Sequence, residues 1–301
     1  MSETRCGFVA IIGAPNAGKS TLVNALAGEK ISIVSSKIQT TRMPVRGIVM
    51  HGQSQIIFVD TPGIFLPEKR LERAMVASAW QSGQDADMMV LVVDAQNKKI
   101  DRETRGIMDK LSESRAAHPV ILALNKVDKV SPQALLPLAQ ELNRLYPFAA
   151  TFMISAHKKD GTEDLLKYLA AYVPAGPWMY PADQVSDLPG RMLAAEITRE
   201  KLFENLRQEL PYALTVETEM WEEDEDGSLQ IKQIIIIARE SHKPIILGKG
   251  GAQIRETGAA ARKDLEEIFE RRVRLELFVK VQENWTEDSA HYELWGLDFS
   301  A

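Results

Sequence analysis

The sequence predicts an α/β domain with a mostly parallel central sheet, followed by a smaller α+β domain. Three observations support this. Up to about residue 173, short apolar runs alternate with amphipathic stretches, as in strands joined by crossover helices. A proline-rich, non-periodic stretch follows, and the remaining chain has the order helix, strand, strand, helix, helix, strand. We therefore expect a first domain at residues 1–173, a linker at 174–190 and a second domain at 191–301.

The boundaries of the expected elements come from hydrophobic periodicity and from glycine and proline positions. In the first domain we expect strands at residues 7–12, 45–51, 55–60, 88–94, 119–124 and 150–154, and helices at 19–27, 70–83, 101–112, 132–145 and 161–172. In the second domain we expect helices at 191–209, 243–247 and 252–270, and strands at 213–221, 229–239 and 273–282.

Composition limits the class of protein. The chain has 301 residues, a net charge of -6 and one cysteine, Cys6, which lies in an apolar run and is expected to fill the core. Its apolar runs are too short to span a bilayer, so we expect a cytoplasmic protein. The first 175 residues carry a small excess of basic residues and the rest a large excess of acidic ones, so bulk charge gives no indication of nucleic-acid binding.

A phosphate-binding loop follows the first expected strand. The stretch matches G-x-x-x-x-G-K-[ST] between a strand and a helix. Gly13 and Gly18 allow the backbone to approach phosphate oxygens, Lys19 supplies a point charge, and the Ser20 hydroxyl can ligate Mg²⁺. The alternative, a plain glycine-rich turn, does not require lysine and serine at these positions. The residues expected to contact phosphates are Gly13, Ala14, Pro15, Asn16, Ala17, Gly18, Lys19, Ser20 and Thr21.

Two further segments are expected beside the phosphate loop, and the first of them lies at the carboxyl end of a strand, where ligands bind in such folds. The run Asp60, Thr61, Pro62 and Gly63 follows the third strand; its aspartate can hold Mg²⁺ through water and the Gly63 N–H can meet a γ-phosphate. Without a phosphate loop earlier in the chain, this run would be interpreted as an ordinary turn. The polar segment 35–43, between the phosphate loop and the second strand, contains Thr40 and Thr41. We expect Thr41, rather than Thr40, to ligate Mg²⁺ only while a γ-phosphate is present.

Specificity for the base is expected from Asn125, Lys126 and Asp128, which follow the fifth strand. The Asp128 carboxylate can accept two hydrogen bonds from guanine, whereas adenine would leave it unpaired. This favours GTP over ATP, although an aspartate here could instead cap the next helix. Ser155 and Ala156 follow the sixth strand, and a backbone N–H there could contact the guanine O6.

The second domain contains a tight glycine loop between two expected helices. Residues 246–254 resemble the I-G-x-x-G-x-x-I signature of KH domains of the αββααβ type, in which such a loop lets an RNA backbone approach. Eight basic and five acidic residues lie between 243 and 275, so this strip is locally basic. The alternative is a structural helix-turn-helix. We expect RNA contacts from Lys243, Gly248, Lys249, Gly250, Gly251, Arg255 and Arg262.

The motifs of the first domain, in this order and spacing, resemble those of translation-factor-like GTPases over about 170 residues. With the KH-like domain behind it, the whole chain resembles the bacterial Era family of GTPases. The resemblance implies a P-loop GTPase domain followed by a KH domain, binding of the 3′ end of small-subunit ribosomal RNA, and assistance in maturing the 30S ribosomal subunit. It also implies some association with the inner face of the membrane. We expect a monomer.

The sequence differs from the Ras-type pattern at the residues that follow Gly63, and this difference concerns GTP hydrolysis. Ile64 and Phe65 follow Gly63 where a Ras-type protein has a water-orienting glutamine, so unaided hydrolysis should be slow. The groups expected to act in the reaction are Lys19, Asn16, Thr41 and Gly63. Asn16 resembles the potassium-coordinating asparagine of related GTPases of the N-x-G-K-S type, so K⁺ is a candidate cofactor beside GTP or GDP and Mg²⁺. Alternatively, Asn16 only stabilises its own turn.

Two rival functions stay open at this point. The chain could be a membrane- or division-linked regulatory GTPase whose KH-like module contacts protein. It could also be a guanine-nucleotide sensor without catalytic activity, because the glutamine is missing.

Overall fold

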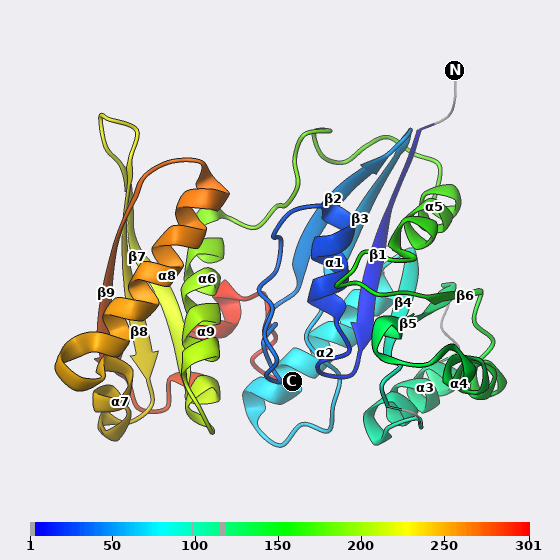
Figure 1. Ribbon diagram of the computed structural model, residues 1–301, viewed down its shortest axis with the longest axis horizontal. Coiled ribbons are helices and arrows are strands. Elements are labelled where there is room, and N and C mark those ends of the chain that lie inside the picture. Colours follow the sequence, from blue (N-terminus) through cyan, green and yellow to red (C-terminus); the bar gives the residue numbers. More distant parts are fainter. Residues whose placement is uncertain (1–3, 98, 115–117) are drawn as a thin grey trace. The chain divides into compact units, whose positions relative to one another are not determined.

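The computed structural model describes residues 4–97, 99–114 and 118–301, and the chain divides into two compact units (Figure 1). The first unit comprises the chain up to Asp187 together with Tyr292–Ala301, and the second is Leu188–His291. The predicted fold class, an α/β domain followed by a smaller α+β domain, is confirmed.

The first unit is built on a six-stranded sheet in the order β2-β3-β1-β4-β5-β6. Only the β2–β3 pair is antiparallel, so the sheet is mostly parallel as predicted. The strands are β1 Arg5–Gly13, β2 Val45–His51, β3 Ser54–Asp60, β4 Met88–Asp94, β5 Val120–Asn125 and β6 Ala150–Met153. The helices are α1 Lys19–Ala27, α2 Arg70–Asp85, α3 Arg102–Ser114, α4 Pro132–Leu145 and α5 Thr162–Tyr172, with a short 3₁₀ helix at Val127–Lys129.

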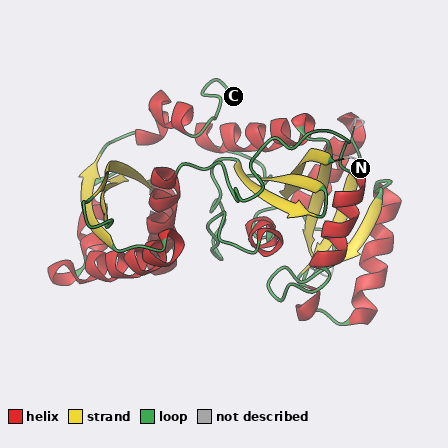
Figure 2. Ribbon diagram, turned by 90° about the horizontal axis from the view of Figure 1, so that it is seen from above, coloured by secondary structure: helices red, strands yellow, loops and turns green. Residues whose placement is uncertain are grey.

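Helices cover both faces of this sheet (Figure 2). One core joins apolar residues of β1, β4 and β5 to the buried stripes of α2, α3 and α4. Helices α1 and α5 contact each other and strands β1–β3. Because β1, β4 and β5 are buried on both faces, they are continuous apolar runs. Their carboxyl ends, which carry the polar motifs, therefore meet at one edge of the sheet.

The predicted linker does not form a helix, and its chain packs along the first unit. Cys6 N–H donates to the Pro174 carbonyl, and Ile48 N–H donates to the Val185 carbonyl at 2.8 Å. Gly47 forms an isolated bridge with Ser186. The exposed side of edge strand β2 is thus covered by residues 185–186. Cys6 is buried, as predicted.

The second unit has a three-stranded sheet, β7-β8-β9, in which β7 and β8 are antiparallel and β8 and β9 parallel. Its elements are α6 Gly190–Asn205, β7 Leu214–Glu223, β8 Leu229–Ile237, α7 Lys243–Leu247, α8 Ala252–Phe269 and β9 Val273–Val281, with 3₁₀ helices at Leu210–Ala213, Glu240–His242, Lys249–Gly251 and Trp285–Glu287. Helix α9, Ser289–Leu294, was not predicted.

The prediction for the first helix of this unit was partly wrong. It was extended to residue 209, but α6 ends at Asn205, and a separate 3₁₀ helix then contains Pro211. Proline at an early position of a short helix is favourable, since its missing N–H is not needed there. The acidic segment between β7 and β8 forms a turn, in which Asp224 N–H donates to the Ser228 carbonyl at 2.8 Å. None of the helices in the described parts of the chain is long and apolar enough to cross a bilayer.

Candidate nucleotide-binding site

The loop between β1 and α1 requires glycine at both ends. Gly13 has φ 153° and Gly18 has φ 97°. A Cβ on Gly13 would collide with the Val92 carbonyl oxygen, and a Cβ on Gly18 would collide with the Asn125 side chain. The loop therefore lies tightly between β4 and the end of β5, with its N–H groups at the start of α1. This is the geometry that binds phosphate oxygens.

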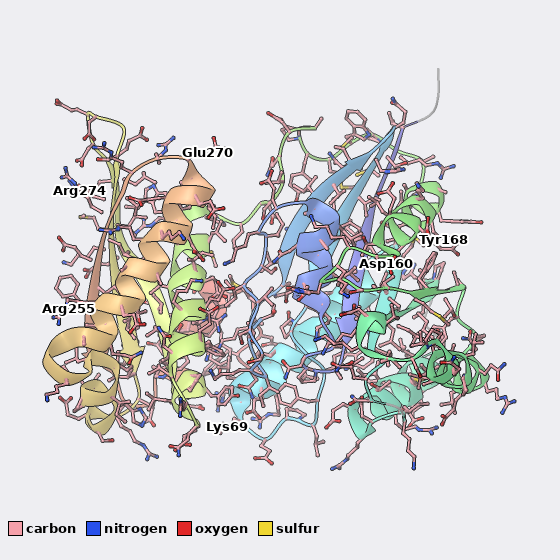
Figure 3. All side chains as sticks on the ribbon, in the orientation of Figure 1. Lys69, Asp160, Tyr168, Arg255, Glu270 and Arg274 are labelled. Carbon is pink, nitrogen blue, oxygen red and sulfur yellow. The ribbon has the colours of Figure 1, made fainter. Side chains whose placement is uncertain are left out.

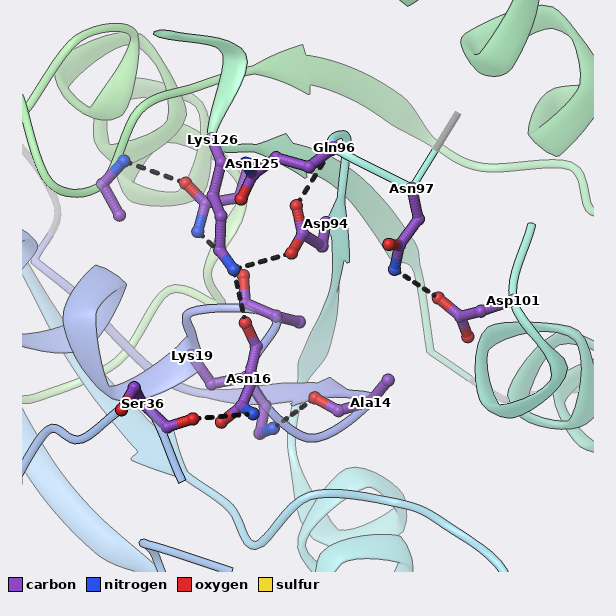
Figure 4. A network of polar contacts seen from close by, with 12 residues as sticks. Ala14, Asn16, Lys19, Ser36, Asp94, Gln96, Asn97, Asp101, Asn125 and Lys126 are labelled. Atoms are coloured by element: carbon purple, nitrogen blue, oxygen red, sulfur yellow. Dashed lines mark hydrogen bonds and ion pairs between the residues drawn. The ribbon is translucent and has the colours of Figure 1, made fainter. Parts of the chain in front are cut away.

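Lys19 opens α1, and its ammonium group is buried. Its Nζ donates to the carbonyl oxygen of Gly13 at 3.2 Å. It also donates to the carbonyl oxygen of Ala14 at 3.0 Å (Figure 4). Burial lowers the pKa of Lys19 to about 8, and the nearby charge of Asp60 opposes part of that shift. Because burial disfavours the positive charge of Lys19, an anionic phosphate would be a favourable counter-charge.

Three oxygen-bearing side chains meet beside Lys19. Ser20 Oγ lies 2.8 Å from Thr41 Oγ1, and Thr41 Oγ1 donates to Asp60 Oδ2 at 3.4 Å. Asp60 is fully buried, and its Oδ1 has no hydrogen-bond partner. Burial raises the pKa of Asp60, while Ser20 and Lys19 lower it in part. A buried carboxylate with an unused oxygen next to two hydroxyls fits Mg²⁺, whose bound water could satisfy Asp60.

The segment after Asp60 packs against the phosphate loop. A Cβ on Gly63 would lie 3.0 Å from Pro15, which explains the need for glycine there. Ile64 N–H donates to the Gly13 carbonyl at 3.0 Å, and the Ile64 side chain is buried in the core. The Thr61 hydroxyl donates to the Ile11 carbonyl at 2.7 Å, so it ties this segment to β1. Only the backbone of Gly63 is left to face a γ-phosphate.

The pair Asn125 and Lys126 joins three loops. Asn125 Nδ2 donates to the Ala17 carbonyl at 2.9 Å, and its Oδ1 accepts from Ala156 N–H at 2.9 Å. Lys126 Nζ donates to the Asn16 carbonyl at 2.8 Å and pairs with Asp94 at 2.6 Å (Figure 4). Both side chains therefore hold the phosphate loop against the loops that follow β4, β5 and β6.

Asp128 stands at the far end of the site. The Ser155 hydroxyl donates to its Oδ1 at 2.7 Å, and this hydrogen bond lowers the pKa of Asp128. The carboxylate is consequently charged at neutral pH. Asp128 lines a cavity of about 240 Å³ together with Gly18, Thr21, Asn125, Lys126, Lys129, Ser155 and His157.

A second cavity, of about 360 Å³, lies over the phosphate loop. It is lined by Pro15, Asn16, Gly18, Lys19, Ser20, Thr21, Thr41, Gly63 and Lys126, all predicted, and by residues of the segment between α1 and β2 that were not: Ile33, Val34, Ser35, Ser36, Lys37, Gln39 and Thr40. Lys129 and His157 were also missed. Each directly follows a predicted motif, so proximity in sequence was the available signal.

The glycine loop of the second unit joins α7 to α8. Its three glycines Gly248, Gly250 and Gly251 all have positive φ, and a Cβ on Gly248 would lie 2.7 Å from the Gln253 Cβ. Arg255 Nη1 donates to the Gly250 carbonyl at 2.7 Å and closes the loop from α8 (labelled in Figure 3). The loop is therefore a tight turn with little side-chain bulk.

The basic strip near this loop is only partly free of acidic partners. Lys243 pairs with Glu240, Arg271 with Glu223 and Arg274 with Asp224. These pairs lie on the surface and are screened by salt, so they compete weakly with an RNA phosphate. Arg255 and Arg262 are seven positions apart on α8 and so lie on the same face of the helix.

This fold and this site define a guanine-nucleotide-binding protein of the P-loop class, joined to a KH domain. Comparison with known proteins agrees: residues 8–126 match the family model described as 50S ribosome-binding GTPase, and residues 209–286 match the KH domain model. GTPase Era of Brucella suis biovar 1 (strain 1330) is 55% identical over 298 residues, which cover 99% of this chain and 95% of that protein. GTPase Era of Bradyrhizobium sp. (strain BTAi1) is 56% identical, with coverage of 99% and 96%.

Two solved structures are similar over nearly the whole chain. Era in complex with MgGDPNP and nucleotides 1506–1542 of 16S ribosomal RNA has a TM-score of 0.92 at 40% identity, covering 97% of this chain and 99% of that one. A variant of Aquifex aeolicus Era bound to GDP·AlF₄⁻ has a TM-score of 0.91, with the same identity and coverage. The chain belongs to the GTPase Era family, as its motifs predicted, and it is a GTPase.

Proposed function

We propose that this GTPase is a switch whose second domain binds the single-stranded 3′ end of small-subunit ribosomal RNA and assists maturation of the 30S subunit. The observation that carries the RNA proposal is the α7–α8 glycine loop, with Arg255 closing it and little side-chain bulk over its backbone. The related Era structure with a 16S ribosomal RNA segment supports the choice of RNA. We retain residues 243–262 as the proposed RNA contact region and 1–173, 174–190 and 191–301 as the proposed domain limits.

In the proposed reaction GTP is the substrate. The loop N–H groups and the Lys19 ammonium bind its phosphates, Gly63 N–H meets the γ-phosphate, and Asp128 with the Ala156 N–H selects guanine. Ser20 and Thr41 would hold Mg²⁺, with Asp60 behind a water molecule, and the ion would neutralise charge between the phosphates. Gly63 is followed by Ile64, which is buried in the core, and by Phe65, and neither has a side-chain amide to orient an attacking water. We therefore propose slow hydrolysis in the absence of an activator.

We further propose K⁺ as a second cation. Asn16 supports this proposal, since its side chain lies between the phosphate loop and the segment bearing Thr41: Nδ2 donates to the Ser36 carbonyl at 3.1 Å. The same hydrogen bond also supports the alternative that Asn16 only stabilises the loops. Comparison of GTP turnover in potassium and sodium salts separates these roles.

We propose a monomer in the cytoplasm, with at most peripheral contact at the inner face of the membrane. Pairing of residues 185–186 with Gly47 and Ile48 supports a monomer, because this part of the β2 edge is then not available for sheet extension by a second copy. A ribosomal RNA partner supports the cytoplasmic location. Light scattering on the purified chain and flotation with vesicles test the two parts.

The RNA proposal is tested by ultraviolet crosslinking in cells, followed by sequencing of the bound RNA and mapping of the crosslinked peptides. We expect reads at the 3′ end of small-subunit ribosomal RNA and crosslinks within residues 243–262. Crosslinks to protein alone, or none in this region, would favour the rival in which the KH module contacts a membrane- or division-linked protein.

A further inference from the structure

A hydrogen bond connects the segment that bears Thr41 to the helix that follows Gly63. Gln39 lies in the loop between α1 and β2, in a left-handed conformation with φ 56°. Its Nε2 donates to Glu72 Oε1 at 3.0 Å, across 33 positions of sequence. Gln39 also lines the cavity over the phosphate loop, so this bond is formed at the wall of the nucleotide site.

Glu72 is itself fixed in place, because it caps the start of α2. Its Oε2 accepts hydrogen bonds from Glu68 N–H at 2.8 Å and Lys69 N–H at 3.1 Å, which satisfies donors that a helix start otherwise leaves free. One carboxylate therefore uses one oxygen for the helix and the other for Gln39.

The hydrogen bond between Gln39 and Glu72 restricts Thr41, which lies two residues beyond Gln39. On its far side the chain enters β2, where Val45 is paired with Asp60. Thr41 is thus held between two anchors, β2 and the Gln39–Glu72 bond, in the position where its Oγ1 meets Ser20 and Asp60. A loop fastened at both ends has fewer conformations to lose when a residue within it must ligate a metal.

We propose that Gln39 and Glu72 are positioning residues, which hold Thr41 in the position from which it can ligate Mg²⁺. The inference rests on the proposed role of Thr41 as a magnesium ligand. It assigns to this chain a link between the segment that bears Thr41 and helix α2, which follows the segment that bears Gly63. Neither residue touches the nucleotide in this proposal; both act through Thr41.

Hydrogen exchange of the nucleotide-free protein tests the tether without reference to activity. Gln39→Ala removes the donor and leaves the cap of α2 intact. We expect faster exchange in peptides covering residues 36–43, by roughly 10- to 150-fold, as for loss of a hydrogen bond to a charged group. Gln81→Ala is the matched control, because Gln81 makes a similar bond of 2.8 Å to Asp85 on the exposed side of α2. It should leave these peptides unchanged.

Exchanging the residue types at positions 39 and 72 tests whether the hydrogen bond itself holds the loop. Gln39→Glu places two carboxylates together and should loosen the loop at least as much as Gln39→Ala. Glu72→Gln alone should behave almost like the unmodified protein, since two amides can still pair and glutamine also caps a helix at this position. In the double variant Q39E/E72Q donor and acceptor exchange places, and protection should return. Failure of the double variant to recover it would overturn the tether.

The effect of the tether on magnesium ligation is tested by measuring how binding of a non-hydrolysable GTP analogue depends on the Mg²⁺ concentration. For Gln39→Ala we expect half-maximal binding of the analogue at roughly 3- to 30-fold higher Mg²⁺. Thr41→Ala provides the second arm. If Thr41→Ala does not raise the Mg²⁺ requirement, the magnesium role of Thr41 is wrong; if it does and Gln39→Ala does not, the positioning role is wrong.

Discussion

The Asn125 side-chain amide donates a 2.9 Å hydrogen bond to the Ala17 carbonyl in the phosphate loop. Its oxygen accepts from Ala156 N–H, so a single buried side chain joins the phosphate end of the site to the base end.

Asn125→Ala would leave a carbonyl and an N–H without partners inside the protein. We expect losses of about 1–3 kcal/mol in folding free energy and a matching loss of GDP affinity, measured by denaturant unfolding and equilibrium titration. Asn143→Ala, which removes a partly exposed amide bonded to Ala139 and Thr151, is the control; equal effects of the two variants would contradict the bridge.

Selectivity for guanine should depend on the Asp128 carboxylate. Ser155 keeps its pKa low, so Asp128 is available as a charged acceptor at neutral pH. Asp128→Asn should weaken GTP binding by roughly 10- to 1,000-fold, because hydrogen bonds to a charged group are lost. The same variant should gain xanthosine triphosphate, whose base offers a carbonyl to the new amide. Titrations with both nucleotides measure the exchange of preference, and unchanged GTP affinity would refute the assignment.

The buried Lys19 ammonium should make nucleotide binding sensitive to alkaline pH. Its pKa is lowered from 10.5 to about 8 in the nucleotide-free fold. Between these values the unfolded chain binds the proton and the folded one does not, so this group makes the free energy of unfolding rise with pH from about 8 to 10.5.

A bound phosphate restores the charge on Lys19. Above about pH 8 binding should therefore take up one proton, and GDP affinity should fall up to ~10-fold per pH unit. Calorimetry at pH 9 in two buffers of different ionisation enthalpy measures the uptake. No uptake at pH 9, or uptake of the same size in Lys19→Met, would contradict this origin.

RNA binding should depend on the backbone of the α7–α8 loop. Gly250 has φ 59°, where a side chain is strained, although a Cβ there would meet no atom within 4 Å. Gly250→Asp adds this strain and a negative charge where a phosphate is expected to pass, so RNA affinity should fall at least ~100-fold. GTP affinity should not change. Gly227→Asp, at a glycine of similar φ in the β7–β8 turn, carries the same charge and is the control; survival of RNA binding in Gly250→Asp would place the contact elsewhere.

Potassium should speed hydrolysis if Asn16 helps to hold it. We expect faster GTP turnover in KCl than in NaCl at equal ionic strength, by about 10-fold if the ion stabilises charge in the transition state. In Asn16→Ala the difference should vanish while nucleotide affinity changes little. Equal rates in both salts would leave Asn16 with the structural role shown by its bond to the Ser36 carbonyl.

Much of the nucleotide site was determined by the sequence alone, because its motifs encode local geometry. Gly13 and Gly18 occupy backbone conformations, and meet neighbouring atoms, that exclude other residues. Strands β1 and β4 are buried on both faces and appear as unbroken apolar runs, so a mostly parallel sheet followed directly. The glycine loop of the second unit was found for the same reason.

Only the tertiary structure decided which side chains form hydrogen bonds between segments that are distant in sequence. The inward hydroxyl of Thr61, the bridge made by Asn125 and the bond between Gln39 and Glu72 each join segments distant in sequence. No periodicity or local propensity records such contacts, since they form only when packing brings the segments together. The proline-rich run after residue 173 was likewise expected to be a plain linker, yet it packs along β2, because an open sheet edge offers backbone donors and acceptors that an extended chain can satisfy.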